Sequence, residues 1–170
     1  MKVPVKILFI RRDNIGDLIC TTPTIRAVRQ RYPDARIDIL VNSYNAEAIR
    51  TNPDINEVHI YRKGKHFPEE SPLEVFWSNL KVIWRLRRQH YDYAIACGSF
   101  TPTLQRFTRM CAAARSVGFV SAETGRASYT DPIPLPPAGE HEVDRVFRLL
   151  LPLGVSGDPG PLLLFPDPAE

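Results

Sequence analysis

The stretch VKILFIRRDNIGD, residues 5–17, decides the fold. Its first six residues form a nearly continuous aliphatic run, which is typical of a strand covered on both faces in a parallel sheet. After the polar turn, apolar residues recur with helical spacing at Ile15, Leu18, Ile25 and Val28, so one helix is predicted over these positions. A buried strand followed at once by a helix is the repeating unit of α/β proteins.

The same alternation continues along the chain. Strands are predicted over residues 36–41, 57–61, 91–97 and 116–119, and helices over 45–52, 73–90, 103–114 and 141–151. Because the connections are short, the pattern favours an α/β fold with a doubly wound, mostly parallel Rossmann-like sheet and helices on both faces.

The helix predicted over residues 73–90 has two interpretations. Trp77, Leu80 and Trp84 recur at helical spacing, and basic residues fill much of the remaining surface. We expect the three apolar side chains in the core, with the basic residues near the helix end complementing its dipole. The alternative is a basic amphipathic helix lying on an anionic membrane surface.

Length and composition restrict the class of protein. A chain of 170 residues, 44% hydrophobic and 24% charged, can form one substantial core and is neither disordered nor a disulfide scaffold. A net charge of +3 is too small to indicate a nucleic-acid partner. Nine of the 16 prolines lie beyond residue 131, so we expect a domain over 1–155 and, over 156–170, a Pro-rich linker or the start of an absent second domain.

The cysteines and the apolar runs indicate the compartment. Cys20, Cys97 and Cys111 form an odd set without C-x-x-C spacing, which predicts reduced, mostly buried thiols and a cytoplasmic protein. The apolar run near the N-terminus is too short for a signal peptide, and no run is long enough to span a membrane.

The residues after the first strand form the first candidate site. Ligands of open α/β sheets bind outside the carboxyl ends of the strands, and Gly16 is expected to let the backbone turn tightly there. Asp17 would lie at the mouth of this crevice, where a carboxylate can act as general base toward an attacking hydroxyl. The alternative is that Asp17 or Asp13 caps the following helix.

A basic cluster after the third strand forms the second candidate. Arg62, Lys63, Lys65 and His66 follow this strand, so they are expected on the same edge as Asp17 and could bind phosphate. The alternative is a solvated surface loop.

Several motifs are absent from the sequence. It contains no G-x-G-x-x-G, no G-x-x-x-x-G-K-[ST] and no G-x-S-x-G, so a nicotinamide enzyme, a P-loop NTPase and a hydrolase elbow are not supported. Neither D-x-D nor H-E-x-x-H occurs, and we expect no metal site.

The segment ILFIRRDNIGDLICTTP, residues 7–23, resembles the amino-terminal signature of glycosyltransferase family 9, the ADP-heptose:lipopolysaccharide heptosyltransferases. The resemblance spans residues 6–154 and continues in IRAVR (25–29), YPDARI (32–37), NPDINEV (52–58), YDYAI (91–95), SVGF (116–119) and HEVDR (141–145).

The resemblance implies a GT-B architecture, in which two Rossmann-like domains face a cleft. This chain would be the N-terminal, acceptor-binding half of an inverting enzyme that transfers heptose from ADP-heptose to a lipopolysaccharide inner-core acceptor. It implies Asp17 as the general base, no essential metal or cofactor, and a donor site in the second domain, without which the 170-residue chain should be inactive. We further expect a bacterial monomer with peripheral contact to the inner membrane.

The acceptor is expected to contact polar and basic residues of the signature and of the loop after the third strand. These residues are Arg11, Arg12, Asn14, Gly16, Thr22, Arg62, Lys63 and Lys65. Relatives often read D-x-Q-G and a basic residue where this chain reads ACGSFTP, residues 96–102, which leaves open a different acceptor or a loss of activity. The rival reading is a non-catalytic Rossmann-like module that binds an anionic glycan or a protein partner.

Overall fold

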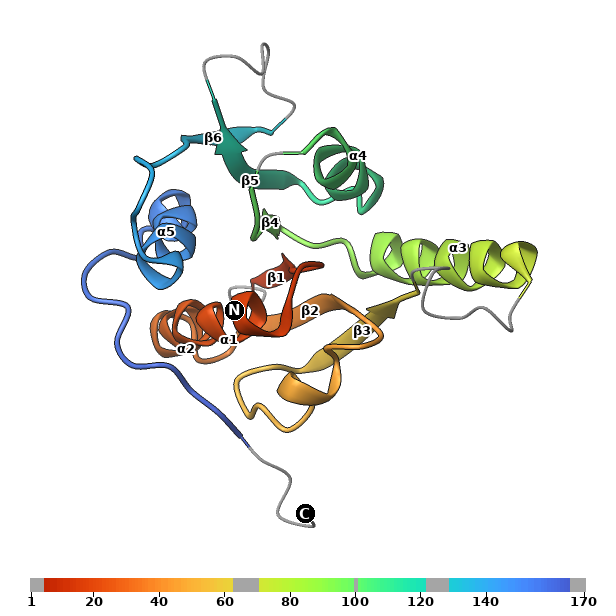
Figure 1. The fold of residues 1–170 in the computed structure, drawn as a ribbon, viewed down its shortest axis with the longest axis horizontal. Coiled ribbons are helices and arrows are strands. Elements are labelled where there is room, and N and C mark those ends of the chain that lie inside the picture. The colour runs from red at the N-terminus through yellow and green to blue at the C-terminus, as the bar shows by residue number, and fades with distance from the viewer. Residues whose placement is uncertain (1–4, 63–70, 100, 122–128, 166–170) are drawn as a thin grey trace.

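A computed structural model describes residues 5–62, 71–99, 101–121 and 129–165 (Figure 1). Their strands form one sheet in the order β3-β2-β1-β4-β5-β6, with every neighbouring pair parallel. The strands are β1 (Lys6–Ile10), β2 (Arg36–Asn42), β3 (Glu57–Tyr61), β4 (Tyr93–Ala96), β5 (Arg115–Val120) and β6 (Asp131–Pro134). This order, which reverses direction at β1, is that of a Rossmann-like sheet and confirms the predicted fold class.

Helices cover both faces of the sheet. They are α1 (Ile15–Cys20), α2 (Thr22–Arg31), α3 (Pro72–Gln89), α4 (Pro102–Met110) and α5 (Glu142–Phe147), with 3-10 helices η1 (Glu47–Ile49) and η4 (Arg148–Leu153). Alternate residues of β1 belong to different cores: Phe9 packs with α1, α2 and α5, whereas Leu8 packs with α3 and α4. None of the helices in the described ranges combines the length and the apolar character needed to cross a bilayer.

The first predicted helix is divided in two at Thr21. Pro23 lies in the first turn of α2 and has no N–H to donate to the Ile19 carbonyl. The Thr22 hydroxyl donates to that carbonyl instead, at 2.7 Å, and the Thr21 N–H bonds to Leu18 at 3.0 Å in a tighter turn. The periodicity was therefore correct for the buried face, but the prediction of one continuous helix was wrong.

Two further elements differ from the sequence predictions. The helix expected over residues 45–52 is only the 3-10 turn η1. The strand β6 was missed because its sequence, DPIP, contains two prolines. Pro132 and Pro134 pair with β5 at the edge of the sheet, where a strand tolerates residues that cannot donate a hydrogen bond.

The expected burial of the apolar residues of α3 was also wrong. Trp77, Leu80 and Trp84 are 57%, 41% and 59% exposed. The side chains of α3 that face the core are Val75, Asn79, Ile83 and Leu86. The helix carries two apolar stripes, and the more aromatic one faces solvent.

Residues 156–165, the described part of the predicted linker, contain no helix or strand and run beside α2 (Figure 1). The Leu163 N–H donates to the Thr22 hydroxyl at 3.1 Å, and the Thr51 hydroxyl bonds to the Phe165 carbonyl. This segment is therefore anchored to the domain at two points. The division of the chain at residue 155 stays a prediction.

Candidate active site

A cavity of about 550 Å³ opens at the carboxyl ends of β1 and β4, where ligands of this kind of sheet bind. Its walls come from the loop after β1, the first turn of α1, the loop between β4 and α4, and the start of α5. Charged residues that line it are Arg11, Arg12, Asp13, Asp17, Glu142 and Arg145. Three positive and three negative formal charges thus cancel across these walls.

Arg11 organises the floor of this cavity although its side chain is only 1% exposed. Its guanidinium donates to the Cys97 carbonyl and to the Glu142 carboxylate, each at 2.6 Å. Its nitrogens also lie 3.4 Å from an oxygen of Asp17 and 3.6 Å from one of Asp13. Burial disfavours the charged guanidinium, but its surroundings, including Glu142 and Asp13, outweigh this effect and raise the pKa of Arg11.

Asp17 lies in the first turn of α1 and lines the cavity. Its side chain is 35% exposed, and its Oδ1 atom is the one closest to Arg11. The N-cap position belongs to Asn14, which also lines the cavity and whose side chain makes no cap hydrogen bond. Asp17 therefore lines the cavity, and its catalytic role stays a proposal.

Arg12 lies against aromatic rings on the other wall. Its guanidinium carbon is 4.1 Å from the centroid of the Tyr61 ring and 4.5 Å from that of Phe107. Burial lowers the pKa of Arg12, but an arginine with so high an ordinary pKa stays charged at neutral pH. The stacking holds this positive charge at the rim of the cavity.

Gly16 does not have the conformation expected from its sequence context. It is a helical residue of α1, and its φ is not among the positive values of the described glycines. A Cβ added there would meet no atom within 4 Å. Its small size therefore leaves open space over the start of α1, and the expectation that it forms a tight turn was wrong.

Two other expected acceptor residues, Thr22 and Arg62, do not line the cavity. Thr22 is buried at the start of α2, where its hydroxyl serves the helix junction and the Leu163 N–H. Arg62 follows β3 and exchanges two backbone hydrogen bonds of 2.9 Å with the side chain of Asn79. Lys63 and Lys65 lie outside the described residues.

The loop after β1 is held in place by the last side chain of β2 and by two that follow this strand. Tyr44 and Asn45 donate to the Asp13 carbonyl at 2.6 and 3.1 Å, and Asn42 donates to the Arg12 carbonyl. These bonds fix the backbone that carries the cavity's charged residues.

Glu142 and Arg145 were missed as site residues by sequence reasoning. Glu142 bridges Arg11 and Arg145, whose Nη1 atom lies 3.2 Å from Glu142 Oε2. Arg145 also donates to the Ser99 hydroxyl at 2.8 Å. The only sequence signal was their place in the HEVDR segment. Their contact with Arg11 has no local signal, because 131 positions separate Arg11 from Glu142.

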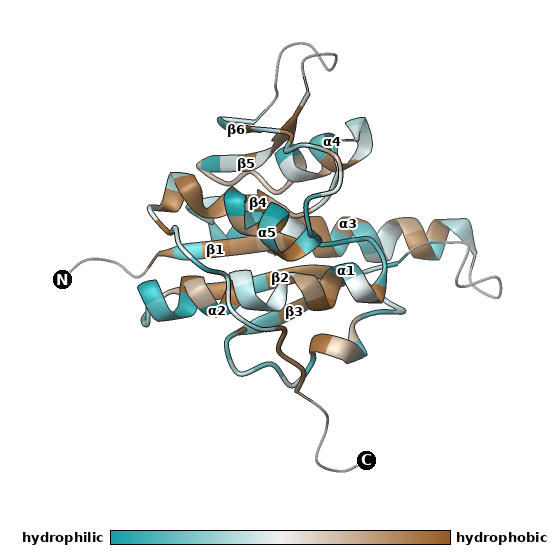
Figure 2. Ribbon diagram, turned by 60° about the vertical axis from the view of Figure 1, so that its left-hand side comes forward, coloured by the Kyte–Doolittle hydropathy of each residue, from teal (hydrophilic) through white to brown (hydrophobic). Residues whose placement is uncertain are grey.

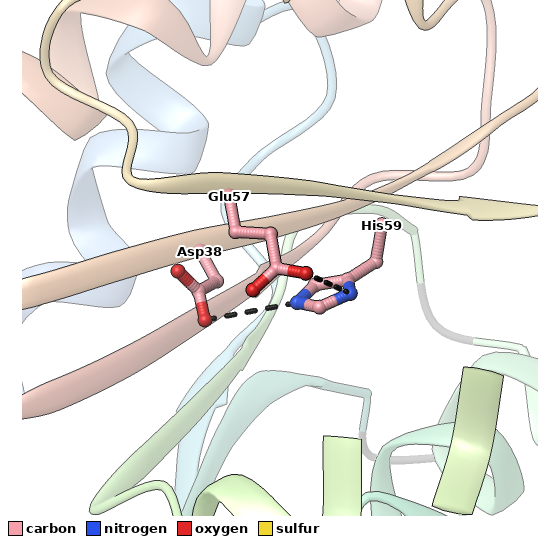
Figure 3. Close-up of side chains that lie close together, drawn as sticks. All are labelled: Asp38, Glu57 and His59. Atoms are coloured by element: carbon pink, nitrogen blue, oxygen red, sulfur yellow. Dashed lines mark ion pairs between the residues drawn. The ribbon is translucent and has the colours of Figure 1, made fainter. Parts of the chain in front are cut away.

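A second charged cluster lies under α3, toward the amino ends of β2 and β3 and away from the cavity (Figure 3). Asp38, Glu57 and His59 offer ligand atoms that all lie within 4.8 Å of one another. Arg36 already donates to Asp38 at 2.9 Å and to Glu57 at 2.5 Å, and the Tyr91 hydroxyl donates to Asp38 at 2.5 Å. Because a guanidinium and a hydroxyl already bond to Asp38 Oδ2 and Glu57 Oε2, the arrangement favours a structural charge network over a metal site.

The hydrogen bonds in this network stabilise the ionised carboxylate. Burial alone would raise the pKa of Asp38, but the bonds from His59, Tyr91 and Arg36 outweigh it and hold this pKa below its usual range. Burial, and then the bond to Asp38, raise the pKa of Tyr91.

The fold and the cavity define a Rossmann-like domain with a charged site at the switch point of its sheet. Comparison with known proteins shows which proteins this domain resembles. No protein-family model matches the chain. Lipopolysaccharide heptosyltransferase 3 of Escherichia coli K12 is 29% identical over 147 residues, which are 83% of this chain and 40% of the relative. A second Escherichia coli protein of that name is 32% identical over 80 residues, 47% of this chain and 22% of that protein.

Solved structures show the same fold. A glycosyltransferase of family 9 from Veillonella parvula superposes with a TM-score of 0.74 at 20% identity, covering 98% of this chain and 46% of that one. The Escherichia coli heptosyltransferase WaaC with ADP gives 0.68 at 16% identity, covering 89% and 48%. These findings confirm the resemblance: the chain is similar in sequence to lipopolysaccharide heptosyltransferases and shares the fold of a family 9 glycosyltransferase. It spans less than half the length of these relatives.

Proposed function

We propose that the chain is the acceptor-binding half of an inverting glycosyltransferase that transfers heptose from ADP-heptose to a lipopolysaccharide inner-core acceptor. The observation that carries the proposal is the position of Asp17, which lines the cavity at the sheet's switch point while Arg11 lies 3.4 Å away. The similarity to heptosyltransferases supplies the substrate class.

In the proposed reaction, Asp17 removes the proton of an acceptor hydroxyl as that oxygen attacks the anomeric carbon of the donor sugar. The new C–O bond forms on the face opposite the diphosphate, so the bond to ADP breaks, ADP leaves with the electron pair and the anomeric configuration inverts. Because Oδ1 lies toward Arg11, we assign the proton to Oδ2. The step needs no metal or cofactor on the acceptor side.

Arg11 and Glu142 act in this proposal as positioning residues. The buried guanidinium is fixed by Glu142 and the Cys97 carbonyl, so it holds the Asp17 carboxylate without itself reaching an acceptor. Arg12 and Arg145, at the walls, are better placed to contact acceptor oxygens. Because the charges of the walls cancel, binding of an anionic core sugar needs added positive charge, for which Arg62, Lys63 and Lys65 remain the candidates.

The donor site is proposed to lie on a second domain, so the 170-residue chain should bind acceptor without transferring sugar. The intact protein is proposed to act in the cytoplasm as a monomer, in peripheral contact with the inner membrane, where a lipid-linked acceptor would lie.

The test is the Asp17→Asn variant of a full-length protein, assayed for ADP release and glycosylated acceptor. We expect turnover to fall by about 10²–10⁴-fold, the usual contribution of a general base, with an unchanged acceptor affinity. The melting temperature should fall only slightly, because asparagine weakens the contact with Arg11. Asp34→Asn, the same change at an exposed turn, is the matched control and should stay fully active. Near-normal turnover of Asp17→Asn would refute the assignment.

A non-catalytic glycan-binding module is the second candidate. It is favoured by the ACGSFTP segment, which lines the cavity with Ser99 and Thr101 and lacks the acid and the basic residue that relatives often carry in this segment. It predicts that the full-length protein binds the acceptor but releases no ADP, and that Asp17→Asn changes neither property.

A further inference from the structure

The exposed side of α3 carries the largest group of exposed large apolar side chains among the described elements. Its large side chains are 41–69% exposed and come from the positions of one helical stripe: Leu73, Phe76, Trp77, Leu80 and Trp84. We call this stripe the α3 outer face. Part of α3 extends beyond the sheet (Figure 2), and the stripe spans residues 73–84 of this helix. Clustered exposed aromatic residues on one element mark an interaction site, in contrast to isolated surface apolar residues.

The α3 outer face is bordered by positive charge. Pro72–Gln89 contains four basic residues and one acidic residue, Glu74, which serves the capping box with Ser71. At about 100° per residue, Lys81 and Arg88 lie on one side of the stripe, and Arg87 continues the stripe toward the end of the helix. The Arg88 guanidinium lies 4.5 Å from the centroid of the Trp84 ring, so charge and aromatic surface are contiguous.

We propose that the α3 outer face docks on an anionic phospholipid surface. Aromatic and aliphatic side chains would enter the boundary of the headgroups, and the flanking Lys and Arg would meet the lipid phosphates. A second copy of the chain is a poorer occupant, because pairing this face with itself would bring Lys81 and Arg88 against the same charges of the partner copy.

The position of α3 connects this surface with the proposed active site. In a parallel sheet the helix after β3 begins at the carboxyl edge, so the exposed first turns of α3 lie at the same edge as the cavity of Asp17. The inference rests on the proposed function, because the docking surface would serve to hold the cavity near a lipid-linked acceptor. Lipid binding itself requires no glycosyl transfer.

The chain carries its own reporters, because its two tryptophans, Trp77 and Trp84, both belong to the α3 outer face. Their fluorescence should be that of exposed indoles in buffer. Titration with vesicles of phosphatidylglycerol and phosphatidylcholine should shift it to shorter wavelength, and brominated lipid chains should quench it. Pure phosphatidylcholine vesicles should bind at least about tenfold more weakly, and raising the salt concentration should remove most of this preference.

Variants separate the contribution of the apolar side chains to vesicle binding from that of the basic side chains. Leu73→Ser with Leu80→Ser should weaken vesicle binding about tenfold or more, whereas Leu151→Ser, at a side chain 55% exposed on η4, should leave it unchanged. Lys81→Gln with Arg88→Gln should weaken binding to anionic vesicles about tenfold or more and binding to phosphatidylcholine little. All these side chains are exposed, so melting temperatures should stay at the wild-type value.

Two results would overturn the inference: emission that vesicles leave unchanged, or emission that shifts with protein concentration in the absence of lipid, which would indicate a second copy. Its failure is distinguishable from that of the proposed function. A full-length protein that transfers sugar to a delipidated acceptor but does not bind vesicles refutes only the docking surface, whereas vesicle binding without transfer refutes only the enzyme.

Discussion

Glu142→Gln tests whether the buried Arg11 pair holds the cavity together. Removing one partner of a buried ion pair costs about 3–5 kcal/mol because the other charge stays desolvated. Here Glu142 is 23% exposed, Asp17 and Asp13 remain 3.4 and 3.6 Å from the guanidinium, and glutamine keeps one acceptor oxygen. These features reduce the expected loss to about 2 kcal/mol.

The loss should be measured by urea unfolding and by thermal melting at pH 7. For a domain of this size, about 2 kcal/mol corresponds to a fall of about 4–8 °C in melting temperature. Glu140→Gln is the matched control, since Glu140 pairs only with the exposed Arg148 in the described structure, and its effect should be much smaller.

A double-mutant cycle identifies the partner. Arg11→Met combined with Glu142→Gln should cost much less than the sum of the two single changes, because each single change already breaks the same pair. If Glu142→Gln is as mild as Glu140→Gln, or if the cycle is additive, the reasoning about the Arg11 pair is wrong.

Three further predictions concern the packing around the site and the charge network. Tyr91→Phe should lower the free energy of unfolding by about 1.5–3 kcal/mol at pH 7. The pKa of Asp38 is lowered in the folded state, so the difference should shrink as urea titrations are taken below about pH 4, where the carboxylate protonates first in the unfolded chain and, at lower pH, in the folded protein. Iodoacetamide at pH 7.5 should label Cys20 first in the native protein, because burial raises the pKa of the Cys97 and Cys111 thiols to about 12. Mass spectrometry reads the labelling, and equal labelling of the three cysteines would contradict this prediction. Gly98→Ala would place a Cβ 2.9 Å from an Asp13 carboxylate oxygen, so calorimetry should show a loss of about 1 kcal/mol and a full-length enzyme should show a raised KM for acceptor; unchanged values would mean that the cavity wall yields freely.

The sheet could be predicted because its central strands are locally encoded. The run Lys6–Ile10 is apolar on both faces, and its burial on both sides by two separate cores follows directly. Strand β3 matched its predicted bounds, Glu57–Tyr61. The edge strand β6 escaped prediction because pairing with β5, not local propensity, orders its two prolines.

The edge that holds the cavity was also predictable, since the rule for parallel sheets placed Asp17 there. The pairing inside the cavity was not. Arg11 reads in sequence as a free basic residue, yet its contact with Glu142 depends on how α5 packs 131 positions later. The outer face of α3 was misjudged for a related reason: periodicity finds apolar stripes but does not say which stripe the sheet covers.

The central claim is that the acceptor hydroxyl meets Asp17 in the cavity at the carboxyl ends of β1 and β4. The most direct measurement is a crystal structure of a full-length protein with ADP and an acceptor fragment. The account predicts a reactive hydroxyl within about 2.6–3.2 Å of the Asp17 carboxylate, on the side away from Arg11. An acceptor bound with every hydroxyl out of hydrogen-bond reach of Asp17 while the donor is in place would contradict it.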